Sequence, residues 1–229
     1  MKILKKRRQF VIGISIALWL NFFLVLPGAL AKSELLSEVI AKTQERYEKT
    51  EDLKAQFIYE VTIKSVDKIE RETGMFYLKK PMNMLWDYEK PKTKKIVINQ
   101  QKAFLYIPGD HVLYVQNVES IFKSMPAVRF FSGIGKLQDE FQISFTQPDH
   151  FDGDGNYLLT MVPKDATFSI QKIFLTIDKS NFHIVQCSFT DMYGNVTSIR
   201  FRNIMVNNKL SAGLFTFTPP PGVEIVNMP

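Results

Sequence analysis

The stretch FYLKKPMNMLWDYEKP (residues 76–91) joins a basic turn to a strongly apolar strand pattern. Large side chains recur at every second position, namely Met82, Met84, Trp86 and Tyr88. Successive side chains of a strand point to opposite faces, so these four share one face that must be hidden from water. Lys79-Lys80-Pro81 comes just before them and predicts a turn at the rim of the sheet. The apolar face is therefore either ordinary core or the wall of a space that holds a ligand.

The same alternation runs through most of the chain. Ser33 is a plausible N-cap, and an amphipathic helix is expected from there to about Glu51. Beyond it we expect about eleven short strands, at 53–64, 71–80, 83–88, 94–99, 102–107, 112–117, 141–146, 157–162, 170–178, 182–190 and 196–204. The turn sequences between them, such as PGD at 108–110, predict antiparallel neighbours in one domain.

Residues 1–31 have the pattern of a cleaved secretory signal peptide. Five cations open the chain, an apolar run follows, and Ala29-Leu30-Ala31 supplies a small-residue cleavage site. The alternative is an uncleaved membrane anchor, because the apolar run from Phe10 to Leu26 approaches spanning length. Arg7-Arg8 leaves open whether export uses the general secretory route or the twin-arginine route.

Removal of the leader would change the charge balance. The whole chain carries 29 basic and 23 acidic residues, but residues 32–229 would keep only 24 basic against 23 acidic. A nearly neutral domain argues against nucleic acid or an anionic membrane as the partner. Cys187 is the single cysteine, which rules out an internal disulfide, and its strand position predicts a small buried side chain. We expect a soluble monomer in the periplasm, consisting of one domain at 32–229.

The residues that carry chemistry do not form a recognisable catalytic or metal site. His111, His150 and His183 lie in three separate segments without metal-ligand spacing. Residues 152–156, DGDGN, match the first three ligand positions of a calcium loop but lack its later glycine and glutamate, so a hairpin turn is favoured. We therefore expect no enzyme activity, no cofactor and no metal.

A sheet of eleven strands in one layer must curl, and its concave face needs a filling. The residues expected on that face are Phe57, Tyr59, Phe76, Leu78, Met82, Met84, Trp86, Phe104 and Tyr106. The insertion at 118–140 is apolar and broken by Pro and Gly, and it predicts a lid of short helices that would add Phe130 and Phe131. From composition alone the space could be a dry core or a pocket for an apolar ligand.

Two motifs resemble the outer-membrane lipoprotein carrier (LolA) family. The first is LKKPMNMLWDYEKP at 78–91, followed by KKIVIN and FLYIP, and the second is LFTFTPPPGVEIV at 214–226. The leader, the early helix and the apolar insertion also fall where the family has them, so the resemblance covers essentially all of residues 32–229. It implies a predominantly β fold of the α+β class, an incomplete antiparallel β-barrel with a helical lid over an apolar cavity.

The resemblance also implies a function without reaction or cofactor. The family takes acylated lipoproteins from an inner-membrane ABC transporter and delivers them to an outer-membrane acceptor. The residue before the turn proline is typically an Arg that holds the lid closed, and Lys80 stands at that position here. Lysine offers a point charge in place of a rigid fork, so a looser latch is expected. The alternative function is a periplasmic sensor of lipids or lipoproteins on the same half-barrel.

Overall fold

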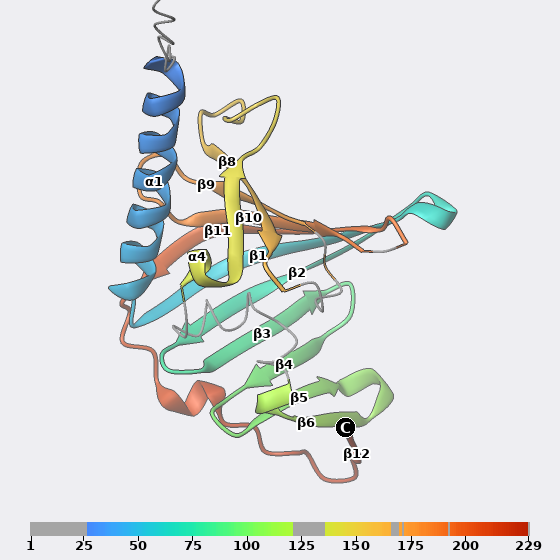
Figure 1. Cartoon of the computed structure of the whole chain (residues 1–229). Coiled ribbons are helices and arrows are strands. Elements are labelled where there is room, and N and C mark those ends of the chain that lie inside the picture. The colour runs from blue at the N-terminus through green and yellow to red at the C-terminus, as the bar shows by residue number, and fades with distance from the viewer. Residues whose placement is uncertain (1–26, 121–135, 166–169, 171, 192, 229) are drawn as a thin grey trace, which may run out of the picture.

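The computed structural model describes residues 27–120, 136–165, 170, 172–191 and 193–228. Its main element is a single curled sheet of twelve strands, with helix α1 (Pro27–Glu48) along one side (Figure 1). The strands are β1 (Asp52–Ile63), β2 (Lys68–Lys79), β3 (Asn83–Lys90), β4 (Lys94–Ile98), β5 (Lys102–Ile107), β6 (Val112–Asn117), β7 (Phe141–Phe145), β8 (Tyr157–Pro163), β9 (Ile173–Ile177), β10 (Ile184–Thr190), β11 (Val196–Val206) and β12 (Glu224–Asn227).

The order of the strands is β12-β6-β5-β4-β3-β2-β1-β11-β10-β9-β8-β7, so β1 lies near the middle. We call the strands from β2 to β6, with β12, the first arm, and those from β11 to β7 the second arm. The arms do not close on each other, because β12 and β7 remain the two edges. The prediction of an incomplete antiparallel barrel is confirmed. All eleven expected strands are present, and β12 is an unexpected twelfth that pairs parallel to β6.

Helix α1 begins at Pro27, ahead of the expected start at Ser33. Ser33 therefore lies inside the helix, where its carbonyl accepts a hydrogen bond from the Ser37 hydroxyl. Within the described residues no helix is long and apolar enough to cross a bilayer.

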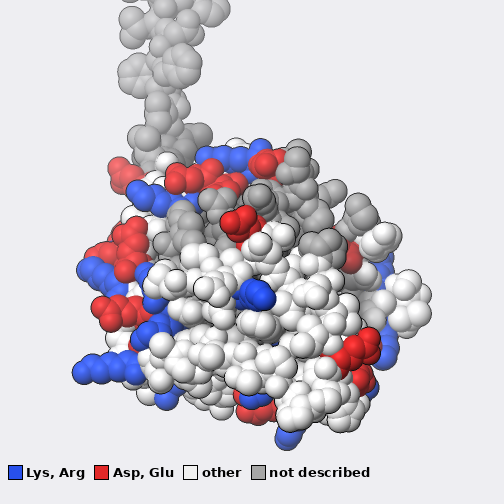
Figure 2. Space-filling view, turned by 90° about the horizontal axis from the view of Figure 1, so that it is seen from below, with Lys and Arg blue, Asp and Glu red and all other residues white. Residues whose placement is uncertain are grey.

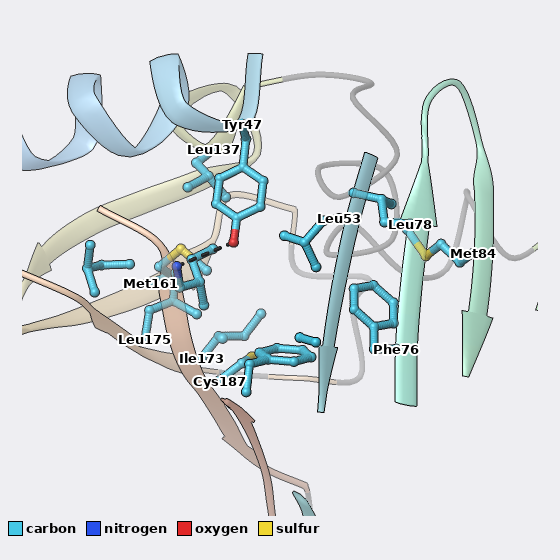
Figure 3. Close-up of a cluster of buried hydrophobic side chains, with 14 of the residues drawn as sticks. Tyr47, Leu53, Phe76, Leu78, Met84, Leu137, Met161, Ile173, Leu175 and Cys187 are labelled. Atoms are coloured by element: carbon cyan, nitrogen blue, oxygen red, sulfur yellow. Dashed lines mark hydrogen bonds between the residues drawn. The ribbon is translucent and has the colours of Figure 1, made fainter. Parts of the chain in front are cut away.

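One continuous core joins the two arms of the sheet. Phe57, Leu78 and Met84 from β1 to β3 are buried in the same cluster as Leu175 and Ile184 from the second arm. Figure 3 shows how side chains from α1, α4 (Leu137–Glu140) and several strands converge on it. Cys187 is part of this cluster, as expected, and its burial raises the pKa of the thiol to about 12.

The insertion expected to form a lid is described at its two ends. Residues 118–120 are helical after β6, and α4 leads into β7. Val118 and Leu137 are both buried in the main core. Both ends thus agree with a helical cover, whereas Phe130 and Phe131 lie outside the described residues.

The segment 152–156 is a hairpin turn, as favoured over a calcium loop. The Asp152 carboxylate accepts hydrogen bonds from the backbone of Asp154 and Asn156 and from the Asn156 side chain. Partial burial raises the pKa of this carboxyl, but the hydrogen bonds outweigh it and the net shift is downward. Asp191 and Asn195 form the same arrangement between β10 and β11. These acids stabilise turns, and no group of three or more metal-ligating acids, histidines or cysteines occurs in the described part of the chain.

The molecule shows a largely uncharged surface from one side. Figure 2 views it from below Figure 1, on the side of β5, β6 and β12, and uncharged residues cover most of this face. The charged residues that border it are of both signs. This face therefore offers no basic stripe of the kind that binds nucleic acid.

Gly74 in β2 is a position where the sheet leaves no room for a side chain. A Cβ there would stand 2.0 Å from the carbonyl oxygen of Asp87 in β3. The register shifts between Thr73 and Gly74, and Phe57 of β1 lies opposite the glycine. Close approach of the two backbones at this shift is what requires glycine.

We predict that Gly74→Ala lowers the free energy of unfolding by about 3 kcal/mol, because the backbone must move to admit the methyl group. Chemical denaturation measures the change. Gly109→Ala is the matched control, since a Cβ there meets nothing within 4 Å. Equal stability of both variants would contradict the close approach.

Candidate functional site: an apolar concave face and its brace

The candidate binding face is built from rows of side chains that cross the first arm. Strand pairing aligns Leu53, Leu78, Met84, Ile98 and Ala103 in one row. A neighbouring row contains Ala55, Phe76, Trp86, Ile96 and Leu105. Alternation along each strand places both rows on the same side of the sheet. The sequence pattern of residues 82–88 thus continues sideways into an apolar face five strands wide.

Aromatic rings form the centre of this face. Phe57 meets Trp86 and Tyr88 edge-on, with ring centroids 5.1 and 4.8 Å apart. Phe76 packs against Trp86 at 4.3 Å and reaches Phe201 of the second arm at 5.5 Å. Such pairs add stability beyond their buried area. Tyr59, at the end of the cluster, is half-buried, and burial raises the pKa of its hydroxyl.

Two expected members of the face are misplaced. Phe104 pairs with Val97 and Tyr106 with Lys95, and the residues that pair with Trp86 and Met84 are Ile96 and Ile98. Phe104 and Tyr106 therefore point to the opposite side, where both rings pack on Phe217 at 5.6 and 5.4 Å. The prediction was wrong because residues 102–107 are apolar at nearly every position, so the sequence does not fix which set faces inward.

Met82 also differs from its expected position in a strand. It lies in the turn between β2 and β3 with φ of 63°. Its side chain nevertheless packs on the main core beside the concave face. The remaining predicted residues, Phe57, Tyr59, Phe76, Leu78, Met84 and Trp86, lie together. Sequence reasoning missed Leu53, Ile96, Ile98 and Phe201, although the alternation in 53–57 and 96–98 carried the signal for the first three.

Lys80 holds the end of α1. Its ammonium group donates hydrogen bonds to the backbone carbonyls of Tyr47 and, at 3.1 Å, Glu48. These carbonyls belong to the last turn of the helix, where no later residue of the helix can donate to them and the helix dipole favours a cation. Burial lowers the pKa of Lys80, and the charge of Glu48 opposes that shift. The partner is thus the N-terminal helix and not the described ends of the 118–140 insertion.

The same turn of α1 also holds the second arm. The Arg46 side chain donates to the carbonyl of Asn181 at 2.9 Å, and the Tyr47 hydroxyl accepts from the Ile184 backbone at 3.3 Å. Tyr47 is buried and its ring lies over the core (Figure 3). We call the contacts of residues 46–48 with Lys80 and with 181–184 the brace. They connect the β2–β3 turn to the β9–β10 turn, one from each arm.

A buried acid secures the segment next to the brace. The Asp52 carboxylate accepts hydrogen bonds from the backbone of Asn208 at 2.7 Å and Leu210 at 3.0 Å. Asn207 donates from its backbone to the Asp52 carbonyl and from its side chain to Lys49. The chain that leaves β11 is therefore fixed where α1 passes into β1.

Two pockets lined by described residues lie away from the apolar face. One, of about 200 Å³, is lined mainly by polar residues, among them Asn83, Asn99 and Gln101. The other, of about 240 Å³, lies between α1 and the residues around α4 and includes Gln44, Lys136 and Gln138. The described side chains of the concave face are instead packed against one another.

The chain is similar to known proteins over most of its length. A family model described as outer membrane lipoprotein carrier protein LolA matches residues 48–218. The outer-membrane lipoprotein carrier protein of Methylobacillus flagellatus is 28% identical over 180 residues, which cover 79% of this chain and 84% of that protein. The protein of the same description from Methylococcus capsulatus is 29% identical over 152 residues, 66% of this chain and 70% of the relative.

A solved structure supports the fold. An uncharacterized conserved protein from Thermus thermophilus superposes with a TM-score of 0.54 and covers 84% of this chain and 98% of its own. The two sequences are 12% identical, so this similarity concerns the fold alone.

We predict that Lys80→Leu loosens the last turn of α1, because the Glu48 carbonyl loses the ammonium donor and the Tyr47 carbonyl keeps only the hydrogen bond from the Thr50 backbone. Amide hydrogen exchange at Lys49 and Thr50 should accelerate, and the free energy of unfolding should fall by about 1 kcal/mol, since the lysine is partly exposed. Lys92→Leu, at an exposed position, is the control. Lys80→Arg should restore protection, and protection unchanged in Lys80→Leu would refute the role of this contact.

His183 should make the brace sensitive to acid. The residue is buried, and its Nε2 atom has no hydrogen-bond partner among the described residues. Burial lowers its pKa, the nearby Arg46 lowers it further, and Asp178 opposes them. In the unfolded chain the pKa is about 6.5, so below that pH the unfolded state binds more protons than the folded state.

We therefore predict that the folded state loses stability as the pH falls from 7 through 6.5 toward the lower pKa of folded His183. Urea denaturation at a series of pH values should show this slope in the wild type and a flatter one in His183→Leu. His111→Leu, at an exposed turn, is the control. Parallel curves for wild type and His183→Leu would contradict the assignment.

Proposed function

Because the chain belongs to the LolA family of outer membrane lipoprotein carrier proteins, we propose that it carries the acyl chains of lipoproteins across the periplasm. In this proposal residues 1–31 are removed on export, an inner-membrane ABC transporter loads the carrier, and an outer-membrane acceptor receives the cargo. The family consists of carriers, and the protein is accordingly not an enzyme.

The observation that carries the proposal is the concave face. Rows of apolar side chains cross five strands on one side of the sheet, with rings of Phe57, Phe76 and Trp86 at the centre. We assign acyl contacts to Phe57, Tyr59, Phe76, Leu78, Met82, Met84 and Trp86, and we retain Phe130 and Phe131 as predicted contacts from the insertion. Each acyl methylene exposed to water costs about 0.8 kcal/mol, so lipoproteins need such a face to cross water.

The packed state of the face suits a carrier that must also release its cargo. Side chains such as Leu78 and Met84 are already buried without a ligand. An entering acyl chain therefore exchanges protein–protein contacts for protein–acyl contacts, and the net affinity is the difference between them. In the proposal the brace sets that difference, because opening the arms removes the hydrogen bonds of Lys80, Arg46 and Tyr47. No observation on the described residues favours the sensor alternative over the carrier.

The test uses a dansylated fatty acid, whose fluorescence rises in apolar surroundings, with protein purified from the periplasm. We expect saturable binding that acylated lipoprotein displaces. Trp86→Gln should weaken binding about tenfold, because a half-buried polar amide replaces an apolar ring on the concave face.

Tyr106→Gln is the matched control, since it makes a similar change on the opposite face and should bind as the wild type does. Absence of saturable probe binding in the wild type, or equal weakening in both variants, would refute the acyl-binding face. Depletion of the protein in cells should leave lipoproteins in the inner membrane, which fractionation measures.

A further inference from the structure

The β1–β2 hairpin ends in exposed apolar side chains. Val66 is 65% exposed and Ile69 is 66% exposed, and nearby lie Tyr193 of the β10–β11 turn at 78% and Val196, the first residue of β11, at 40%. Figure 1 shows this hairpin projecting beyond the rest of the sheet. Strand pairing explains the projection. β3 ends at Lys90, which pairs with Thr73, so residues 68–72 of β2 extend past the end of β3. We call Val66, Ile69, Tyr193 and Val196 the hairpin tip.

The two loops of the hairpin tip are held together. The Lys64 backbone donates to the Asn195 side chain at 3.1 Å, and Gly194 lies so close to Lys64 that a Cβ there would meet its Cδ at 3.0 Å. The Asp191 carboxylate accepts from the backbone of Tyr193 and Asn195, which fixes the second loop. The two loops that carry these apolar side chains are therefore fixed to each other.

Uncharged and charged residues lie in separate rows on one face of this end of the sheet. Ile69, Thr62 and Val196 are aligned in one row by strand pairing, and this row is uncharged. The next row on the same face, nearer the body, contains Arg71, Glu60 and Ser198. The Arg71 and Glu60 side chains form an ion pair at 3.8 Å. On this face an uncharged row is followed by a polar row, an order found in segments that lie at a lipid–water interface, while the turn between Val66 and Ile69 also exposes Asp67 and Lys68.

The size and charge of the hairpin tip favour a lipid surface over a protein partner. Four side chains are far fewer than the roughly 20–30 residues that each side of a stable protein interface uses. A bilayer needs no complementary shape and accepts a convex end. The surrounding charges nearly balance, with Lys64, Lys68 and Arg71 against Glu60, Asp67, Glu70 and Asp191. That balance suits a zwitterionic surface and gives no attraction to an anionic one.

We propose that the hairpin tip inserts into the interfacial region of a zwitterionic bilayer and docks the protein transiently on it. The inference goes beyond acyl binding and does not depend on it, because none of its residues lies among those assigned to the concave face. Few apolar side chains take part, so the contact is weak and reversible. It would position the protein at a membrane without the help of anionic lipid.

The experiment places a tryptophan at the tip. Val66→Trp protein, purified from the periplasm and with its N-terminus determined by mass spectrometry, is mixed with phosphatidylcholine vesicles that carry bromine on the upper part of the acyl chains. We expect quenching beyond that of the parent protein, which measures contact of residue 66 with the lipid. Met205→Trp is the matched control, because Met205 is 50% exposed but lies at the other end of β11.

A second variant tests how much the apolar side chains contribute to vesicle binding. Val66→Ser with Ile69→Ser should reduce the vesicle-bound fraction at least tenfold in sedimentation, while binding of the dansylated fatty acid stays as in the wild type. Equal quenching at residues 66 and 205, or vesicle binding unchanged in the double serine variant, would overturn the proposal. So would binding that needs anionic lipid and disappears at high salt, or a tip that binds a purified protein partner and no vesicles.

Discussion

The structure depends on how the last turn of one helix finds partners for its carbonyl groups. The carbonyls at the end of α1 need donors from elsewhere, and Lys80 supplies them from the β2–β3 turn. Since Arg46 and Tyr47 of the same turn hold the β9–β10 turn, a short piece of helix fixes the relative position of both arms. The sheet itself joins the arms only through β1, because its two edges, β12 and β7, do not close on each other. The contacts of α1 therefore add a second link between the arms, and breaking these contacts would let the curvature of the sheet change.

Much of the fold could be predicted because apolar and polar residues alternate along most of its strands. The inward set at 53–59 and at 84–88 is unambiguous, and turn sequences separate most strands. β12 was not predicted, since four residues after three prolines give too short a pattern and the partner strand lies more than a hundred residues earlier. The helical residues before Ser33 were also not predicted, because a serine in this sequence context looks like an N-cap whether or not helical residues precede it.

The candidate site was predictable only where one face of a strand is polar. Phe104 and Tyr106 belong to a strand that is apolar on both sides, so its inward set is decided by the register with β4. On the outer face Phe104 packs against a smaller cluster, in which Leu85, Val97 and Phe215 are buried. Lys80 was recognised from its place before Pro81, but its partner could not be, since a hydrogen bond across more than thirty residues leaves no trace in local sequence.

The parallel pairing of β12 with β6 affects how readily the protein can associate with other copies of itself. An unclosed sheet presents free backbone groups at its edges, and such edges recruit strands of other molecules. Here the chain returns after Pro219-Pro220-Pro221, and Glu224 and Met228 donate to the carbonyls of His111 and Val115. The edge of β6 is thus occupied by a strand that is short, carries an acid and follows residues without N–H groups. The protein can keep its sheet open without offering a long template for self-assembly.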